Sequence, residues 1–193
     1  MELPLHIILT FSSLIYGLAL AHSLSCMAEY IQNRSEIKQY WVWWIWAIII
    51  LFLSLGFWVS TYISWKDASI PMKGFVAIVT QSSIFYLTCY LFFNHINEMK
   101  KKDLEHEYYK NKKLTFILIL VQYFFIFVLF DMIRDNLSIN DIFHHILNYI
   151  PLPMFILNPF TFLILLAFID NKRFQSTLSV FILLGAMIQF LFN

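Results

Sequence analysis

Three side chains near the end of the first apolar segment are of types that bind metal ions or transfer protons. His22, Cys26 and Glu29 are spaced by four and three residues, so on a helix they share one face. A thiol and an imidazole are zinc ligands, and an imidazole beside a carboxylate can relay protons near neutral pH. The spacing therefore predicts a polar edge with three open uses: a metal site, a proton relay, or the wet end of a membrane helix.

A second polar group is expected at the same depth. The third apolar segment ends in CYLFFNHINE, which contributes His95 and Glu98. Neither group has the HExxH or CxxC spacing of known metal sites. A structural role at the membrane interface is therefore preferred, and no metal or cofactor is assigned. The candidate site is a polar vestibule formed by His22, Cys26, Glu29, His95 and Glu98.

The elements that must position these groups are membrane helices. The chain of 193 residues is 60% hydrophobic, 19% aromatic and only 13% charged, with a mean hydropathy of +0.70. Soluble domains are about 45–50% apolar and about 25% charged, so much of this apolar surface must face lipid. The net charge of +1 gives no basic field for nucleic acid. We expect an all-α, multi-pass transmembrane bundle that forms one membrane domain.

Six segments reach about 20 residues, the length that crosses ~30 Å of hydrocarbon. The fifth is the weakest because Pro151, Pro153 and Pro159 crowd its first half, and Pro159 should kink it or make it re-entrant. All six tryptophans lie between Trp41 and Trp65 and are interpreted as aromatic belts. The predicted spans are 5–27, 41–64, 75–95, 114–133, 152–169 and 174–192.

Lysine and arginine set the expected orientation. Ten of the 13 fall in the first, third and fifth loops, so the positive-inside rule predicts that both termini are outside and that loop 95–113 is cytoplasmic. This loop, HINEMKKKDLEHEYYKNKK, is expected to continue the third span as a helix or hairpin. It is either a solvated loop near anionic headgroups or a docking surface for a cytosolic protein. The candidate docking residues are Lys100, Lys101, Lys102, Tyr108, Tyr109, Lys112 and Lys113.

Deeper polar residues are few. The mid-span amides Gln81 and Gln122 are expected to hydrogen-bond across helices. The predicted spans carry no Asp, Lys or Arg at mid-depth. A charged residue at that depth is the usual mark of an ion-coupled transporter, so its absence counts against that class. No GxSxG, HExxH, Walker or GxGxxG motif supports catalysis, so we predict that the protein is not an enzyme.

A family resemblance enters through the first 65 residues. The stretches SSLIYGLALAHSL and YWVWWIWAIIILFLSLGFWVSTY, with the small multi-pass architecture, resemble the membrane accessory proteins of type VI-B CRISPR loci. The resemblance implies a bacterial inner-membrane protein that modulates an RNA-guided nuclease in antiviral defence. It carries over no functional residue.

The predicted function is therefore a non-enzymatic accessory or effector protein, with a small pore as one form of the effector, and we expect it to be a homo-oligomer. It lies in the lipid bilayer, meets a cytosolic partner through loop 95–113 and binds no nucleic acid directly. The alternative is a small transporter or an ion or proton channel with the vestibule around His22, Glu29 and His95. A membrane-embedded metalloenzyme that uses the same residues is the third hypothesis.

Overall fold

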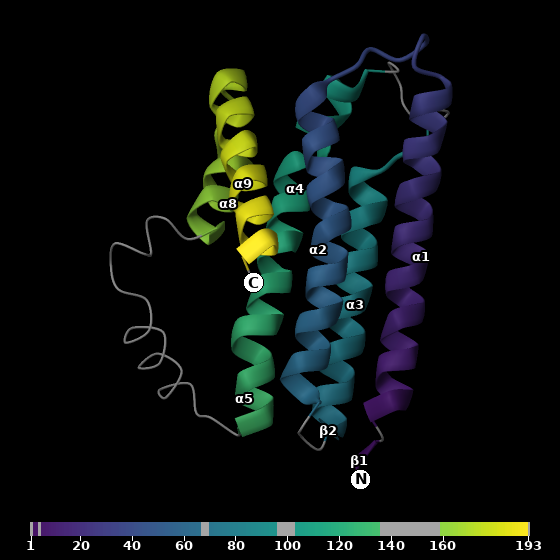
Figure 1. Cartoon of the computed structure of the whole chain (residues 1–193), viewed down its shortest axis with the longest axis vertical. Coiled ribbons are helices and arrows are strands. Elements are labelled where there is room, and N and C mark those ends of the chain that lie inside the picture. Colours follow the sequence, from purple (N-terminus) through teal and green to yellow (C-terminus); the bar gives the residue numbers. More distant parts are fainter. Residues whose placement is uncertain (1, 4, 67–69, 96–102, 136–158, 193) are drawn as a thin grey trace.

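The computed structural model describes residues 2–3, 5–66, 70–95, 103–135 and 159–192. These residues are mostly helical, as predicted. Long helices run side by side along the long axis of the molecule, and the helices of the C-terminal part of the chain lie at one end of this bundle (Figure 1). In chain order the elements are β1 (Glu2–Leu3), α1 (Leu5–Gln32), α2 (Trp41–Trp65), β2 (Ile70–Pro71), α3 (Met72–Phe92), α4 (Leu104–Phe124), the π-helical η2 (Phe125–Leu129), α5 (Phe130–Asp135), α8 (Pro159–Phe168) and α9 (Lys172–Phe192).

Three described helices are long and apolar enough to cross a membrane: α1, α2 and α3. The multi-pass helical class is therefore supported, whereas a count of six spans is not confirmed. The predicted fourth span lies in the continuous helical stretch of α4, η2 and α5. Of the predicted fifth span, 152–158 lies outside the described residues, and α8 has only 10 residues, about 15 Å of helix.

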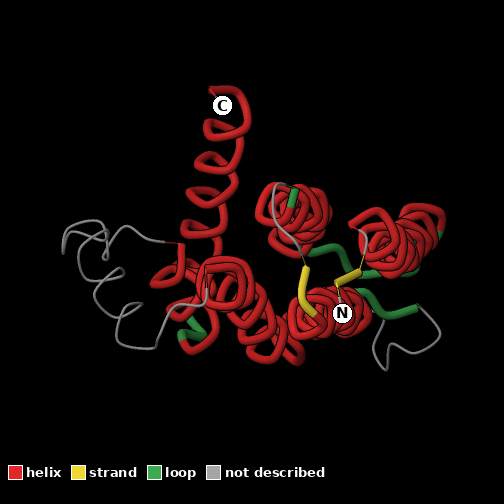
Figure 2. The backbone as a smooth tube through the Cα atoms, turned by 90° about the horizontal axis from the view of Figure 1, so that it is seen from below, coloured by secondary structure: helices red, strands yellow, loops and turns green. Residues whose placement is uncertain are grey.

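The bundle is built on the packing of α1 against α3 and of α3 against α4, with α2 beside α1. Viewed from the N-terminal end, α9 leaves the bundle and runs away from the other helices (Figure 2). At this same end the strands β1 and β2 pair antiparallel, with Leu3 opposite Ile70, and so tie the N-terminus to the start of α3. Pro159 begins α8, the position where its missing N–H costs nothing.

The prediction that the tryptophans form belts against lipid is wrong for three of the six. Trp43, Trp46 and Trp65 are almost fully buried. Trp46 donates its indole N–H to Ser179 Oγ of α9 at 2.8 Å, and Trp43 stacks on Phe92 with ring centroids 5.3 Å apart. These rings fill the bundle interior because they find aromatic and hydroxyl partners there.

The outer surface of the described helices is apolar. Large side chains on α1, α2 and α9 are more than half exposed, among them Leu14, Leu18, Phe52, Leu55 and Phe181. A contiguous apolar surface of this kind is unusual on a soluble monomer. It fits helices whose outward faces contact lipid.

The prediction that loop 95–113 continues the third span as one helix is wrong, and the alternative of a hairpin rests in part on 96–102, which lie outside the described residues. α3 ends at Phe92, and residues 104–113 are instead the first turns of α4. Asp103 is the N-cap of that helix, because its carboxylate accepts hydrogen bonds from the backbone N–H of Glu105 at 2.9 Å and of His106 at 3.3 Å. An N-cap aspartate followed by acidic residues in the first turn is a strong helix start.

Candidate functional site

One face of α1 holds the chain where α3 ends. The helix α3 stops at Phe92, so the next carbonyls need partners from outside the helix. His22 Nε2 donates to the Phe93 carbonyl at 2.8 Å, and the Cys26 thiol lies 3.8 Å from the same oxygen. One turn further, Tyr30 donates its hydroxyl proton to the Asn94 carbonyl. The polar edge of α1 therefore replaces the hydrogen bonds that α3 has lost.

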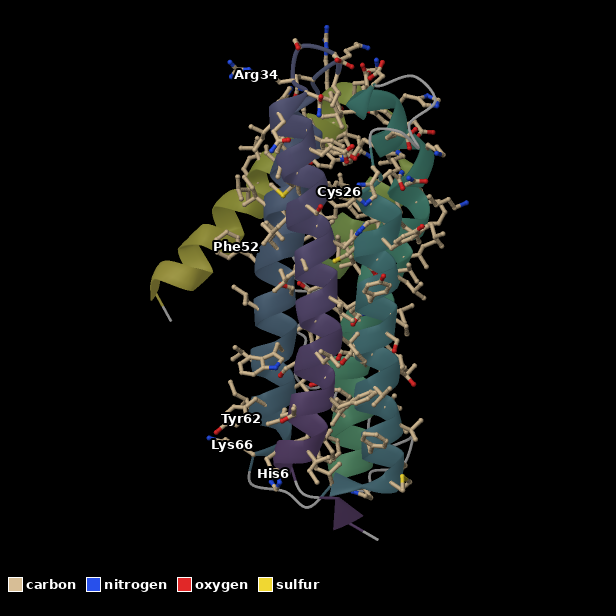
Figure 3. The ribbon with its side chains drawn as sticks, turned by 90° about the vertical axis from the view of Figure 1, so that its right-hand side faces the viewer. His6, Cys26, Arg34, Phe52, Tyr62 and Lys66 are labelled. Atoms are coloured by element: carbon tan, nitrogen blue, oxygen red, sulfur yellow. The ribbon has the colours of Figure 1, made fainter. Side chains whose placement is uncertain are left out.

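His95 completes the cluster from the other side. Its Nδ1 donates to Glu29 Oε2 at 2.9 Å, with the two side chains 43% and 26% exposed. The His95 ring lies edge-on to the His22 ring at 5.5 Å, and His22 stacks on Tyr90 of α3 at 5.3 Å. The site thus has a buried floor at Cys26 and a partly open mouth between Glu29 and His95. Figure 3 shows Cys26 toward the end of the bundle that carries Arg34, far from His6 and Lys66.

Four of the five predicted vestibule residues meet in this cluster: His22, Cys26, Glu29 and His95. Glu98 lies outside the described residues. Sequence reasoning missed Tyr30, although it lies one residue beyond Glu29 and on the same helical face as His22. It also missed the role of the Phe93 carbonyl, for which the sequence has no signal.

A buried carboxylate lies behind the cluster. Glu107 of α4 is only 4% exposed. Its Oε2 accepts from Asn94 Nδ2 at 3.1 Å and from Lys110 Nζ at 3.0 Å, while its Oε1 has no hydrogen-bond partner among the residues that the structure describes. Glu107 therefore fixes the Asn94 side chain, just as Tyr30 fixes the Asn94 carbonyl.

Ion pairs fasten the surrounding charged end of the bundle. Lys38 Nζ lies 2.9 Å from Asp103 Oδ2 and 3.3 Å from Glu105 Oε2, and Lys172 pairs with the other oxygen of Glu105. The hydrogen bonds that Lys38 donates to Asp103 and Glu105 raise the pKa of Lys38. The hydrogen bond from Lys172 is the main cause that lowers the pKa of Glu105. We name Lys38, Asp103, Glu105 and Lys172 the charged collar; it joins the α1–α2 loop to α4 and α9.

The predicted docking residues are not one exposed surface. Tyr108 is buried and donates to Gln175 Oε1 at 2.6 Å. Lys112 is 4% exposed, donates to the Ile169 carbonyl at 3.0 Å and pairs with Asp170 at 2.5 Å. Tyr108 therefore joins α4 to α9, and Lys112 joins α4 to the α8–α9 turn, so the structure places neither side chain on an exposed surface.

The remaining predicted docking residues have mixed positions. Tyr109 is half-buried beside Tyr40, with 3.4 Å between the hydroxyls. Lys113 is exposed and lies over the Phe168 ring at 5.0 Å. Lys100, Lys101 and Lys102 lie outside the described residues.

A second polar group lies deeper, where α1, α3 and α4 meet. Gln81 donates its amide N–H to Tyr16 Oη at 2.6 Å, and Gln122 donates to the backbone carbonyl of Gln81 at 3.0 Å. Both amides are fully buried. The Thr115 hydroxyl, seven residues before Gln122 in α4, is buried as well. Among the described residues, the Oε1 atoms of Gln81 and Gln122 and the Thr115 hydroxyl have no hydrogen-bond partner. Tyr16, the partner of Gln81, lies six residues before His22 on α1, which is about 9 Å of helical rise.

No protein-family model matches the chain, and no curated protein and no solved structure matches it. The resemblance to accessory proteins of type VI-B CRISPR loci thus stays a prediction from the sequence. The function has to be argued from the geometry of these two polar groups and of the charged collar.

Proposed function

We propose that the protein is a small membrane transporter or channel for cations. The observation that carries the proposal is the convergence of Glu29, His22 and His95 at the mouth of the α1–α3 interface. Ionisable groups at membrane helices are costly, and they commonly mark the path of an ion. A carboxylate at a partly open mouth also raises the local concentration of cations.

The deeper polar group supports the same function. The side-chain carbonyl oxygens of Gln81 and Gln122 are fully buried and have no hydrogen-bond partner in the part of the chain that the structure describes. Such oxygens replace the hydration shell of an ion in selective pores, whereas an unpaired buried amide oxygen otherwise costs roughly 1–3 kcal/mol. We assign the two amides to a second binding level along the path, below the vestibule.

The orientation belongs to the proposal as well. The loops on the side of the vestibule carry ten of the 13 Lys and Arg residues. By the positive-inside rule this side faces the cytoplasm. We therefore propose that the vestibule opens to the cytoplasm of a bacterial cell and that the outer exit lies toward the N-terminus.

Purified protein in liposomes tests the function. We expect flux of a monovalent or divalent cation above that of empty liposomes, measured with trapped ion-sensitive dyes. Gln122→Leu should reduce this flux roughly tenfold, because one lost oxygen ligand costs on the order of 1–2 kcal/mol. Gln39→Leu is the matched control, since Gln39 is exposed in the α1–α2 loop and its hydrogen bonds are with Ile37 and Trp44, which the proposed path does not use. Wild-type protein that passes no cation above empty liposomes would refute the proposal.

A second candidate function rests on the exposed cations around the charged collar. Lys38, Lys110, Lys113 and Lys172 are all exposed at one end of the bundle. An accessory protein that holds a cytosolic partner would use such a surface. Co-purification of a cytosolic protein encoded beside the gene should then be lost in a Lys110→Glu, Lys113→Glu variant and kept in Ser176→Ala. An RNA-guided nuclease as that neighbour would favour this function over the first.

A further inference from the structure

We propose that His22, Cys26 and His95 form a binding site for a borderline-soft transition-metal cation, of which Zn²⁺ is the probe. This inference deepens the proposed function. The role of the metal ion in transport rests on that function, whereas metal binding itself is measured without any flux experiment. The proposal stands on the positions of the three ligand atoms, on the hydrogen bond that orients His95, and on the ligand chemistry.

The ligand atoms are close enough for one ion. One nitrogen from each imidazole and the Cys26 sulfur all lie within 4.8 Å of one another, and Cys26 Sγ lies 3.9 Å from His22 Nε2. Tetrahedral zinc, with Zn–S of about 2.3 Å and Zn–N of about 2.0–2.1 Å, needs ligand atoms roughly 3.4–3.6 Å apart. Side-chain shifts of about 1 Å or less therefore complete the site.

Glu29 prepares His95 for this role. The Glu29 carboxylate accepts the Nδ1–H of His95 at 2.9 Å, which leaves the lone pair of the neutral ring on Nε2. A carboxylate that holds the far nitrogen of a metal-binding histidine is the usual outer partner in such sites. Glu29 is thus a positioning residue, and its contact with His95 differs from a generic helix-end ion pair.

His22 binds the metal ion through Nε2, the nitrogen that lies 3.9 Å from Cys26 Sγ. In the metal-free protein the Nε2–H is donated to the Phe93 carbonyl, so on binding the ring proton must lie on Nδ1 and this hydrogen bond is given up. The Cys26 thiol must lose its proton on binding, because the thiolate is the ligand. One proton per metal ion is then released to the solvent, and no redox step is involved.

The ligand set selects the class of cation. One thiolate and two imidazoles suit Zn²⁺ and similar transition metals, whereas Mg²⁺ and Ca²⁺ prefer oxygen ligands. Three protein ligands leave one position of a tetrahedral ion open for water. An open position allows exchange, which a cation in transit needs and a closed four-ligand structural site does not provide.

Equilibrium binding to the full-length protein in detergent tests the site. We expect one Zn²⁺ per chain, displaced by Co²⁺ with the near-ultraviolet charge-transfer band that only a thiolate ligand produces. Cys26→Ser should abolish the band and weaken Zn²⁺ binding by about 100-fold or more, and Glu29→Gln should weaken it by about 10–100-fold. Cys89→Ser and His106→Gln are the matched controls, because Cys89 is an equally buried thiol and His106 an exposed imidazole outside the cluster.

His22→Gln separates metal binding from a purely structural role. Glutamine keeps an N–H donor for the Phe93 carbonyl, so the fold and the melting temperature should be retained while Zn²⁺ binding is lost. Zn²⁺ binding of equal strength in wild type, Cys26→Ser and His22→Gln, or no binding to wild type, would overturn the inference. Binding without cation flux in liposomes would refute the proposed transport function and leave the metal site standing.

Discussion

Glu29 and His95 join the last turns of α1 to the segment that follows α3, with 2.9 Å between carboxylate oxygen and Nδ1. The pair spans 66 positions of sequence and lies half open to solvent. It connects the two helices whose packing dominates the bundle, and it also fixes the face that His95 turns toward Cys26.

Breaking this contact should affect stability only slightly. Glu29→Gln and His95→Gln should each lower the free energy of unfolding by about 1 kcal/mol or less, because a half-exposed pair is weakened by solvent. The double variant should cost less than the sum of the two, since each single change already removes the contact. Urea denaturation in mixed micelles measures all four proteins. Strictly additive costs would show that the two side chains do not interact.

The charged collar should make stability depend on pH at both extremes. The pKa of Asp103 and of Glu105 is lowered and the pKa of Lys38 is raised in the folded protein. The carboxylates therefore stabilise the fold above their ordinary pKa values of 3.8 and 4.5, and this contribution is lost as pH falls through the lower folded values. The Lys38 contribution is present below 10.5 and is lost as pH rises through the higher folded value.

Glu105→Gln tests the acid limb. Melting temperature between about pH 5 and about pH 3 should fall less steeply in this variant than in wild type, because one of the carboxylates that loses its charge is absent. The loss at neutral pH should be on the order of 1 kcal/mol or less. Glu36→Gln, at an exposed loop position, is the control. Identical acid limbs in Glu105→Gln and wild type would contradict the assigned ion pairs.

Replacing Gly74 or Gly56 by alanine should change the stability of the protein in opposite directions. A Cβ on Gly74 would lie 3.0 Å from a Trp65 ring atom and 3.1 Å from Ile70 Cγ2, whereas Gly56 has nothing within 4 Å. Gly74→Ala should cost about 1–3 kcal/mol because Trp65 is fully buried and cannot retreat. Gly56→Ala should stabilise α2 by roughly 0.5–1 kcal/mol. Thermal denaturation of the two variants in one detergent measures the difference in sign.

Local sequence pattern predicted the part of the site that lies within one helix. The spacing of His22, Cys26 and Glu29 placed them on one face of α1, and that face forms in the structure. The approach of His95 followed from helix length alone, since segments of similar length that cross the same layer end at the same level. Both inferences use the regular rise of a helix and need no knowledge of packing.

Long-range packing decided what the sequence could not predict. Trp46 is buried because Ser179 accepts its N–H from 133 positions away, and no local pattern distinguishes it from the exposed Trp41. Likewise α3 ends at Phe92 without a Pro or Gly nearby. It can end there because His22 and Tyr30 supply the hydrogen bonds that the next turn would have made.

The proposed orientation makes a direct prediction about topology. Reporter fusions after Lys102 should read cytoplasmic, and fusions at Asp67 and at the C-terminus should read external, because the six-span prediction assigns ten of the 13 Lys and Arg residues to the same side as Lys102. The measurement is paired phosphatase and fluorescent-protein activity in cells. An external reading at Lys102 would place the vestibule on the opposite side of the membrane.

Cys26 and Cys89 should differ in their reactivity toward maleimide only when the His22 ring beside Cys26 is removed. Cys26 and Cys89 are 0% and 1% exposed, so neither should react with a water-soluble maleimide in native membranes, although a metal ion is small enough to enter between Glu29 and His95. His22→Ala removes the ring that lies 3.9 Å from Cys26 Sγ. This variant should make Cys26 react at least tenfold faster, a change of about 1.4 kcal/mol in the cost of access, and leave Cys89 inert. Mass shifts after timed labelling measure both rates. Fast labelling of Cys26 in wild type would show that the floor of the vestibule is open to water rather than closed by His22.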